Sequence, residues 1–241
     1  MKKVHIGFAL LFTCLLTVAY AAPKQILMVV TSAGAMTNGE PTGLWLEEFA
    51  LPYQLFSEQG YAITVASPKG GKAPVDERSL QDENQVSTWT NATTALEKTK
   101  TLDAVNAADF DALFIPGGHG TMFDFPGNAE LQRLLHNFHA QDKIIASVCH
   151  GPAAFVGTKT ADGTPLVKGK TITAFTDAEE KAVGLDSAVP FLLEKSLRAE
   201  GANFVPAELW QPNTQVDGKL VTGQNPASSQ GCAEAVIKLL Q

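Results

Sequence analysis

Cys149 and His150 are the residues whose types and spacing point most directly to chemistry in this 241-residue sequence. They follow an apolar run at 144–148 and precede Gly151-Pro152, which interrupts regular structure. A strand that ends in such a turn before a helix holds the turn residue near the helix N-terminus. The helix dipole and an adjacent imidazole both favour a thiolate, so we expect a pKa below the free value of about 8.5. We therefore predict that Cys149 is a nucleophile; a small apolar cysteine at a strand end is the simpler alternative.

A thiol nucleophile needs a base and a group that orients the base. His150 is the predicted base, and its alternative is a structural histidine that closes the turn. Acids that follow another strand lie in the segment from Thr176 to Glu180. Thr176 and Glu179 have the spacing of a capping box, which gives Glu179 a structural role. Glu180 is therefore the predicted orienting acid, and we expect the loss of Glu179 to cost about 1 kcal/mol or less.

Two further segments supply polar groups. Gly117 and Gly118 follow a strand-like run, and their N–H groups could stabilise an oxyanion, although a tight turn explains them equally well. His119, the next residue, is open to both interpretations. Glu48 lies at a predicted helix start, where an acid is favourable to the helix dipole and needs no other role. We predict no metal site from the spacing of histidine, cysteine and acidic residues.

The elements that must position these residues appear as alternating apolar patterns. Strands are predicted at 25–31, 62–66, 112–115, 144–148, 170–173 and 219–222. Helices are predicted at 52–59 with a lead-in from Leu46, and at 129–140, 152–156, 177–183, 189–198 and 229–240. This alternation indicates a mostly parallel central sheet with helices on both faces, a three-layer α/β sandwich in which ligands bind beyond the carboxyl ends of the strands. Residues 67–109 are interpreted as an insertion that packs over the site, within one domain at 22–241.

Residues 1–21 have the three parts of a secretory signal peptide: Lys2 and Lys3, an apolar run, and small residues before a cleavage point near Ala21. Cleavage there predicts an exported protein, periplasmic or secreted. No later segment is apolar enough to span a membrane, so we expect no membrane partner for the mature form. Loss of both lysines changes the formal net charge from −7 to −9, and this acidic balance argues against a nucleic-acid partner.

Cys149 and Cys232 are the cysteines that remain after residue 21, too few for a disulfide framework. Cys232 shares a helical face with Val236 and Leu240, so core packing explains it. A disulfide between the two cysteines would silence the predicted nucleophile, and the sequence leaves this pairing open.

Several motifs together resemble one known family. Residues 146–152 and 116–124 carry the resemblance, and further matching motifs lie at 42–52, 76–80, 169–180 and 220–228. On these residues the chain is similar to the ThiJ/PfpI superfamily, and within it to the glutathione-independent glyoxalases, the glyoxalase III branch, whose members are also described as chaperone-deglycases. The resemblance covers nearly the whole chain after residue 21. It implies the class I glutamine amidotransferase-like fold, which is flavodoxin-like.

The resemblance also implies roles for individual residues. Cys149 matches the family nucleophile, His150 the neighbouring base, Glu180 the third member of the triad, and Glu48 the carboxyl that contacts the cysteine. The implied substrate is a small 2-oxoaldehyde such as methylglyoxal, which the thiolate converts to lactate without a cofactor. A like charge beside the thiolate would keep Glu48 protonated. A homodimer is expected from the family alone.

Two other functions stay open. The chain could be a stress holdase whose cysteine only senses oxidation, or a cysteine peptidase or amidase that uses the same triad. An insertion over the site favours small substrates over peptides. The predicted export is where this sequence departs from the familiar members of the branch, which are intracellular.

If residues 1–21 are a signal peptide, the mature protein begins at Ala22 and lies outside the cytoplasm. N-terminal sequencing of the protein purified from its native cells measures this directly. A native chain that begins at Met1, or one recovered from the cytosol alone, would contradict export.

Overall fold

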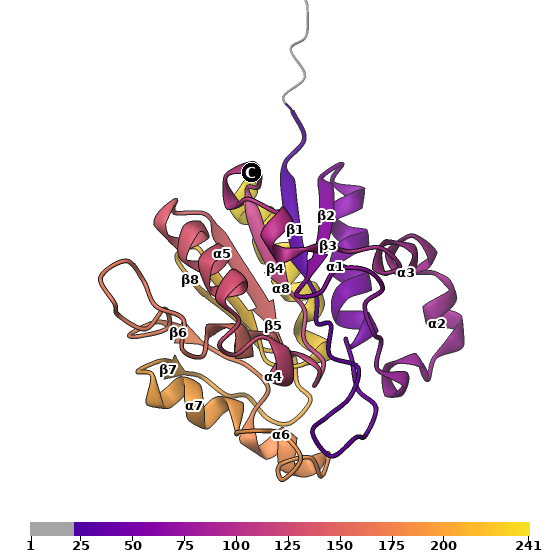
Figure 1. The fold of residues 1–241 in the computed structure, drawn as a ribbon, viewed down its shortest axis with the longest axis vertical. Helices are drawn as coiled ribbons and strands as arrows, with labels where there is room; N and C mark the ends of the chain where they lie inside the picture. The colour runs from indigo at the N-terminus through magenta and orange to yellow at the C-terminus, as the bar shows by residue number, and fades with distance from the viewer. Residues whose placement is uncertain (1–21) are drawn as a thin grey trace, which may run out of the picture.

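The computed structural model describes residues 22–241, and the predicted signal peptide lies outside these residues. A seven-stranded sheet forms the centre of the molecule, in the order β3-β2-β1-β4-β5-β9-β8 (Figure 1). All neighbouring strands in it are parallel except β8, which is antiparallel to β9. The strands are β1 (Gln25–Val29), β2 (Ala62–Ser67), β3 (Lys100–Thr101), β4 (Ala112–Ile115), β5 (Ile144–Val148), β8 (Thr214–Asp217) and β9 (Leu220–Gly223).

Helices cover both faces of this sheet. The α-helices are α1 (Leu46–Glu58), α2 (Glu83–Ser87), α3 (Thr90–Leu96), α4 (Thr121–Asp124), α5 (Ala129–Ala140), α6 (Asp177–Ala182), α7 (Leu193–Ala199) and α8 (Ser229–Leu240). The 3₁₀ helices are η1 (Glu77–Leu80), η2 (Leu102–Ala104), η3 (Ala107–Asp109), η4 (Gly151–Phe155) and η5 (Pro226–Ser228). The predicted three-layer α/β fold with a mostly parallel sheet is confirmed.

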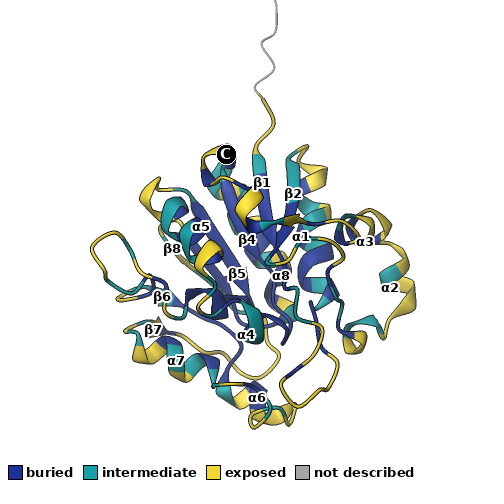
Figure 2. Cartoon of the chain, viewed as in Figure 1, coloured by how far each residue is buried: buried dark blue, intermediate teal, exposed yellow. Residues whose placement is uncertain are grey.

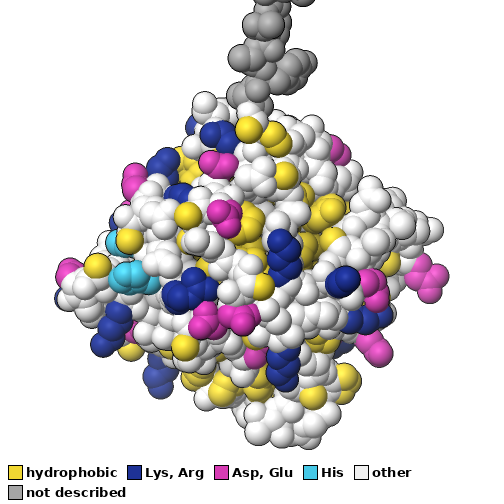
Figure 3. All heavy atoms as spheres, turned by 45° about the horizontal axis from the view of Figure 1, so that its top comes forward, with side chains coloured by type: hydrophobic (Ala, Val, Ile, Leu, Met, Phe, Trp, Pro, Cys, Tyr) yellow, Lys and Arg dark blue, Asp and Glu magenta, His cyan; other side chains and the backbone are white. Residues whose placement is uncertain are grey.

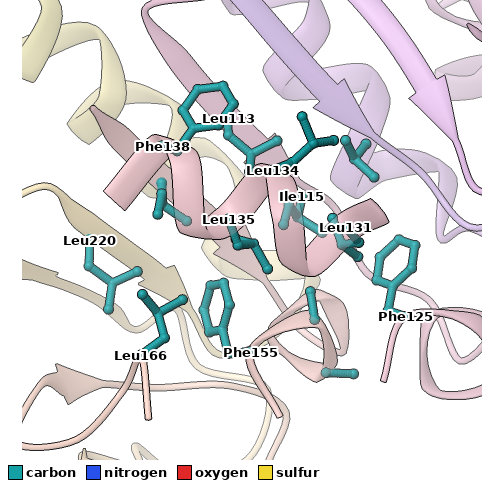
Figure 4. Close-up of a cluster of buried hydrophobic side chains, with 14 of the residues drawn as sticks. Leu113, Ile115, Phe125, Leu131, Leu134, Leu135, Phe138, Phe155, Leu166 and Leu220 are labelled. Atoms are coloured by element: carbon teal, nitrogen blue, oxygen red, sulfur yellow. The ribbon is translucent and has the colours of Figure 1, made fainter. Parts of the chain in front are cut away.

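The two faces of the sheet build two separate hydrophobic clusters, because successive residues of a strand point to opposite sides. In β1, Leu27 belongs to the cluster that includes residues of α5 and α7, whereas Ile26 and Met28 belong to the cluster that includes residues of α1, α3 and α8. The central strands are buried throughout, and the exposed residues lie on the outer helices and loops (Figure 2). Figure 4 shows the first cluster, in which the leucines of α5 lie on β4 beside Phe125 and Phe155. Burial on both faces explains why these strands are continuous apolar runs rather than alternating ones.

The carboxyl ends of the parallel strands meet at one edge of the sheet, at the lower side of Figure 1 near α4 and α6. Gly117 to His119 follow β4, and Cys149 follows β5, the neighbouring strand. The topology therefore brings together two segments that are separated in the sequence, at the edge where such folds bind ligands.

Two predicted elements differ from the structure. The strand predicted at 170–173 is not in the main sheet: its β6 (Thr171–Ile172) pairs with β7 (Asn203–Phe204) in a separate two-stranded sheet. The reason is that β9 occupies the place beside β5. The helix predicted at 152–156 is only the 3₁₀ turn η4.

The segment at 67–109 divides into parts with different positions. Within it, η1 lies at the pocket described below, where Arg78 is a lining residue. By contrast, α3 packs on α1, and Trp89, Ala92 and Leu96 join the second hydrophobic cluster. Part of the segment is thus core structure, while η1 borders the pocket.

The face of the molecule in Figure 3 carries side chains of both charges. On the face shown in Figure 3, Lys and Arg side chains of the described residues are interspersed with Asp and Glu. None of the helices within residues 22–241 is long and apolar enough to cross a membrane.

Candidate active site

Cys149 sits directly after β5 in a left-handed backbone conformation, with φ 59°. This conformation is uncommon for a residue with a side chain and occurs preferentially at functional sites. Two hydrogen bonds hold it: its N–H donates to the carbonyl of Gly223 at 2.9 Å, and its carbonyl accepts from Phe175 N at 2.9 Å. The side chain is 3% exposed and lines a pocket. The predicted sharp turn is therefore present, and hydrogen bonds to the end of β9 and to the loop before α6 hold it in place.

Glu180 joins the two histidines of the site. Its Oε2 accepts a hydrogen bond from His150 Nε2 at 2.7 Å, and its Oε1 pairs with His119 Nε2 at 2.8 Å. On the other side of the His150 ring, Nδ1 lies 3.3 Å from the sulfur of Cys149. The structure thus brings together Cys149, His150 and Glu180 in a row, with His119 as a second partner of the same carboxylate.

These contacts determine where the protons are. Burial raises the pKa of Glu180, but the hydrogen bonds from His119 and His150 outweigh it and hold that pKa well below its usual range. Because an ionised carboxylate only accepts hydrogen bonds, both histidines must carry hydrogen on Nε2. Burial and the neighbouring His150 ring lower the pKa of His119 to about 4, so His119 is neutral at pH 7. Hydrogen on Nε2 of His150 leaves Nδ1, which faces the thiol, as the ring nitrogen that could act as a general base.

A charged pair extends the network beyond His119. The Nδ1 atom of His119 lies 3.5 Å from Nη2 of Arg78, which donates to it. Two further bonds from Arg78, at 2.9 and 2.6 Å, reach the carboxylate of Asp76. Arg78 therefore favours the His119 tautomer that donates to Glu180, and so supports the orientation of His150 indirectly.

Glu48, from the first turn of α1, lies against the sulfur from the buried side. Its Oε2 accepts from Gly117 N at 2.8 Å, while its Oε1 is buried without a hydrogen-bond partner among the described residues. Burial raises the pKa of Glu48 to about 8, and the nearby thiol and Gly117 only partly offset this. The carboxyl is therefore protonated at pH 7, as predicted, although burial rather than charge repulsion is the main cause. Because Oε2 is the acceptor for Gly117, the proton belongs on Oε1.

The prediction that the pKa of Cys149 lies below its free value is wrong. Burial raises the pKa of the thiol, and the carboxyl of Glu48 raises it further. One 3₁₀ turn and one imidazole do not compensate for the loss of water around the sulfur. A reaction at Cys149 would therefore require a base such as His150 to remove the thiol proton during attack.

Of Gly117 and Gly118, which follow β4, only Gly118 has a backbone N–H without a hydrogen-bond partner among the described residues. The N–H of Gly117 is already used by Glu48. Gly118 has φ 94°, lines the pocket, and makes no hydrogen bond through its N–H within residues 22–241. A side chain at Gly118 would collide with the backbone of Gly43 and Trp45, so only glycine fits there. Of the two glycines predicted to bind an oxyanion, Gly118 has the suitable position.

The pocket above the sulfur has a volume of about 380 Å³. Its polar groups are those just described, and its remaining walls are apolar. The lining residues are Trp45, Arg78, Gly118, His119, Cys149, His150, Phe175, Val183, Trp210 and Pro226. Sequence reasoning missed Trp45, Phe175 and Trp210, since an aromatic residue in a loop carries no local signal of a site.

His119, His150 and Glu180 are also close enough to consider as metal ligands, with ligand atoms within 4.8 Å of one another. Each of these atoms already has a hydrogen-bonding partner inside the group. A metal ion would have to displace both Nε2 protons and remove the base from Cys149. The geometry fits an acid-base network better than a metal site.

Comparison with known proteins agrees with this arrangement. Residues 42–239 match the model of the DJ-1/PfpI family. The chain belongs to the DJ-1/PfpI family. It is 36% identical over 236 residues to the glutathione-independent glyoxalase HSP31 of Saccharomyces cerevisiae, covering 91% of this chain and 99% of that protein. The resemblance inferred from the motifs is thereby confirmed.

Solved structures of this family have the same fold. The Rapid Encystment Protein 24 KDa of Francisella tularensis is 37% identical and superposes with a TM-score of 0.86, over 90% of this chain and 99% of that one. Glyoxalase III of Candida albicans is 30% identical and superposes with a TM-score of 0.79, over 89% and 96%.

Glu179 and Glu180 should give opposite phenotypes. The capping box of Glu179 with Thr176 is present, but this buried carboxylate also accepts hydrogen bonds from Trp210 N, Gln224 and Asn225. We expect Glu179→Ala to destabilise the protein by at least about 3 kcal/mol, more than the sequence suggested, because several buried donors lose their acceptor. Denaturant unfolding measures this.

Glu180→Gln should instead lower the rate of reaction at Cys149 by about 10²- to 10⁴-fold through loss of the oriented base. The exposed Glu234→Gln is the control and should change neither quantity. If Glu179→Ala unfolds at the wild-type denaturant concentration, the five hydrogen bonds that the Glu179 carboxylate accepts are not the anchor that the structure indicates.

Glu48 should make stability depend on pH. The pKa of Glu48 is about 8 in the folded protein against an ordinary value of 4.5, so the folded state holds the extra proton between these values. Stability from this group is full below pH 4.5 and is lost as the pH rises towards 8. Glu48→Gln, which mimics the protonated acid, should therefore gain melting temperature relative to wild type between pH 5 and pH 8.

The exposed Glu58 on the same helix supplies the matched control, since Glu58→Gln should show a difference from wild type that does not vary with pH. A constant loss of stability in Glu48→Gln at every pH would mean that Glu48 is ionised in the fold.

Proposed function

We propose that this protein is a glutathione-independent glyoxalase that converts methylglyoxal or a related 2-oxoaldehyde to the 2-hydroxy acid through Cys149. The single observation that carries the proposal is the Cys149–His150–Glu180 row at the base of a pocket, in a chain whose relatives are named glutathione-independent glyoxalases. These residues supply a nucleophile, a base and an orienting acid without any bound group.

The first step is attack of the sulfur on the aldehyde carbon. His150 accepts the thiol proton on Nδ1 as the carbon–sulfur bond forms, and returns it to the aldehyde oxygen to give a hemithioacetal. The N–H of Gly118 is the donor available to the oxygen during this step. Because Glu48 is protonated, no like charge lies behind the sulfur as the thiol loses its proton.

The second step moves a proton between two carbons. A base takes the proton from the former aldehyde carbon, an enediol forms, and the proton returns to the second carbon to leave a thioester. We assign this transfer to His150 rather than Glu48, because His150 lines the pocket while Glu48 does not and is already protonated at pH 7. Water then hydrolyses the thioester, releasing the 2-hydroxy acid and the free thiol.

The other predicted properties remain proposals. Export rests on residues 1–21 alone, and the homodimer rests on the family. A peptidase is less well supported, because the thiol is 3% exposed at the base of a pocket.

Incubation of purified mature protein with methylglyoxal, without glutathione and under reducing conditions, tests the proposal by the appearance of lactate. Cys149→Ala should abolish lactate formation, since no other group can form the thioester. Cys232→Ala is the matched control: Cys232 is buried in α8, its thiol is free, and its loss should leave turnover unchanged.

If wild type forms no lactate from methylglyoxal or glyoxal, the glyoxalase proposal is wrong. A holdase would then be indicated if wild type and Cys149→Ala suppress aggregation of a client protein equally.

A further inference from the structure

The pocket is larger and more apolar than a molecule as small as methylglyoxal requires. Its volume of about 380 Å³ falls in the range of about 300–1,000 Å³ that holds drug-sized ligands. Four of its lining residues, Trp45, Phe175, Val183 and Trp210, come from separate segments of the chain. Of these four residues, only Phe175 packs on a residue of the catalytic row: the centroids of its ring and of the His150 ring are 4.3 Å apart.

Trp210 is the least expected of them. It is 45% exposed, although tryptophan usually buries most of its surface, and its backbone is left-handed with φ 64°. A bulky residue in this conformation is an outlier that the surrounding structure must impose. Here the buried carboxylate of Glu179, in α6, accepts a hydrogen bond from the backbone N–H of Trp210 at 3.1 Å and so anchors the strained loop.

The anchoring places the indole beside the reaction centre. The ring of Trp210 lies 5.8 Å from that of Phe175, which in turn packs on His150. Val183, 42% exposed, follows α6 on the same pocket, and Trp45 precedes α1. Apolar surface held open to water in a fixed, strained arrangement is typical of a binding site.

The charges indicate an uncharged ligand. Arg78 is the cation among the described lining residues, and its guanidinium is already paired with Asp76. Glu180 is likewise paired with two histidines. An acidic substituent would therefore find no free cation, whereas an aromatic ring would find two tryptophans and a phenylalanine.

We propose that Trp45, Val183 and Trp210, with the edge of Phe175, form a subsite for the substituent of the substrate, and that the enzyme prefers 2-oxoaldehydes with a large aromatic or apolar group. The inference rests on the proposed function. The reaction is unchanged: the 2-oxoaldehyde R–CO–CHO takes up one water to give R–CHOH–COOH, with no oxidant or reductant.

Phenylglyoxal, whose product is mandelate, is the probe, and methylglyoxal is the reference substrate. We compare kcat/KM for both in wild type, Trp210→Ala and Trp210→Phe. Trp210→Ala should lower kcat/KM for phenylglyoxal about tenfold, mainly through KM, and that for methylglyoxal less than about twofold, because only the larger substrate contacts the indole. Trp210→Phe should restore most of the loss.

Leu209→Ala is the matched control, because Leu209 is the neighbouring residue, is similarly exposed and does not line the pocket. It should leave both substrates unaffected. Equal losses for the two substrates in Trp210→Ala would overturn the subsite, because they would indicate a general disturbance of the loop. No lactate from methylglyoxal in wild type would instead overturn the glyoxalase function itself.

Product inhibition gives a second measurement that is independent of turnover of the aromatic substrate. Mandelate should inhibit methylglyoxal conversion at least about tenfold more strongly than lactate in wild type, and this ratio should fall towards one in Trp210→Ala. A ratio near one in wild type would contradict an aromatic subsite.

Discussion

The left-handed backbone at Cys149 is the constraint on which the rest of the site depends. The chain turns sharply after β5 in a closely packed region, because Cys149 adopts this conformation next to Gly117 and Gly151. A side chain at either glycine would collide with the surrounding backbone. Tight packing at the turn means that the sulfur cannot move away from His150 or Glu48. The strain is offset by two backbone hydrogen bonds of Cys149, one to the end of β9 and one to the loop before α6. Two separate parts of the fold therefore fix the backbone of one residue.

The first turn of α6 divides two tasks between adjacent carboxylates. Successive helical residues point about 100° apart, so Glu179 and Glu180 face different surroundings. Glu179 turns towards Trp210, Gln224 and Asn225 and holds a loop, whereas Glu180 turns towards the two histidines. The same helix start therefore supports both the base beside Cys149 and the indole at the pocket wall. If the proposed mechanism and subsite are correct, a change in this helix would disturb chemistry and substrate binding together.

Local patterns predicted the parts of the site that depend on local structure. The turn at Cys149, the capping box at Thr176 and the acid at Glu180 follow from the order of residue types alone, as does the layered α/β fold. The pKa of Cys149 does not, since it depends on burial by segments distant in the sequence. Two other features could not be predicted for the same reason. The place of β6 outside the main sheet depends on competition with β9, and the position of Trp210 depends on its hydrogen bond to Glu179; both are tertiary contacts.

Burial of the thiol has a consequence for where such an enzyme can work. A thiolate, not a thiol, is the form that oxidants and disulfides attack, and reactivity also requires access. In this site the sulfur is nearly inaccessible, its pKa is raised, and a protonated Glu48 covers its inner side. In the proposed mechanism, Cys149 becomes a strong nucleophile only while His150 removes its proton in the presence of a carbonyl. An exported enzyme, as residues 1–21 predict, would gain from this arrangement, because an oxidising compartment would otherwise consume a free thiolate.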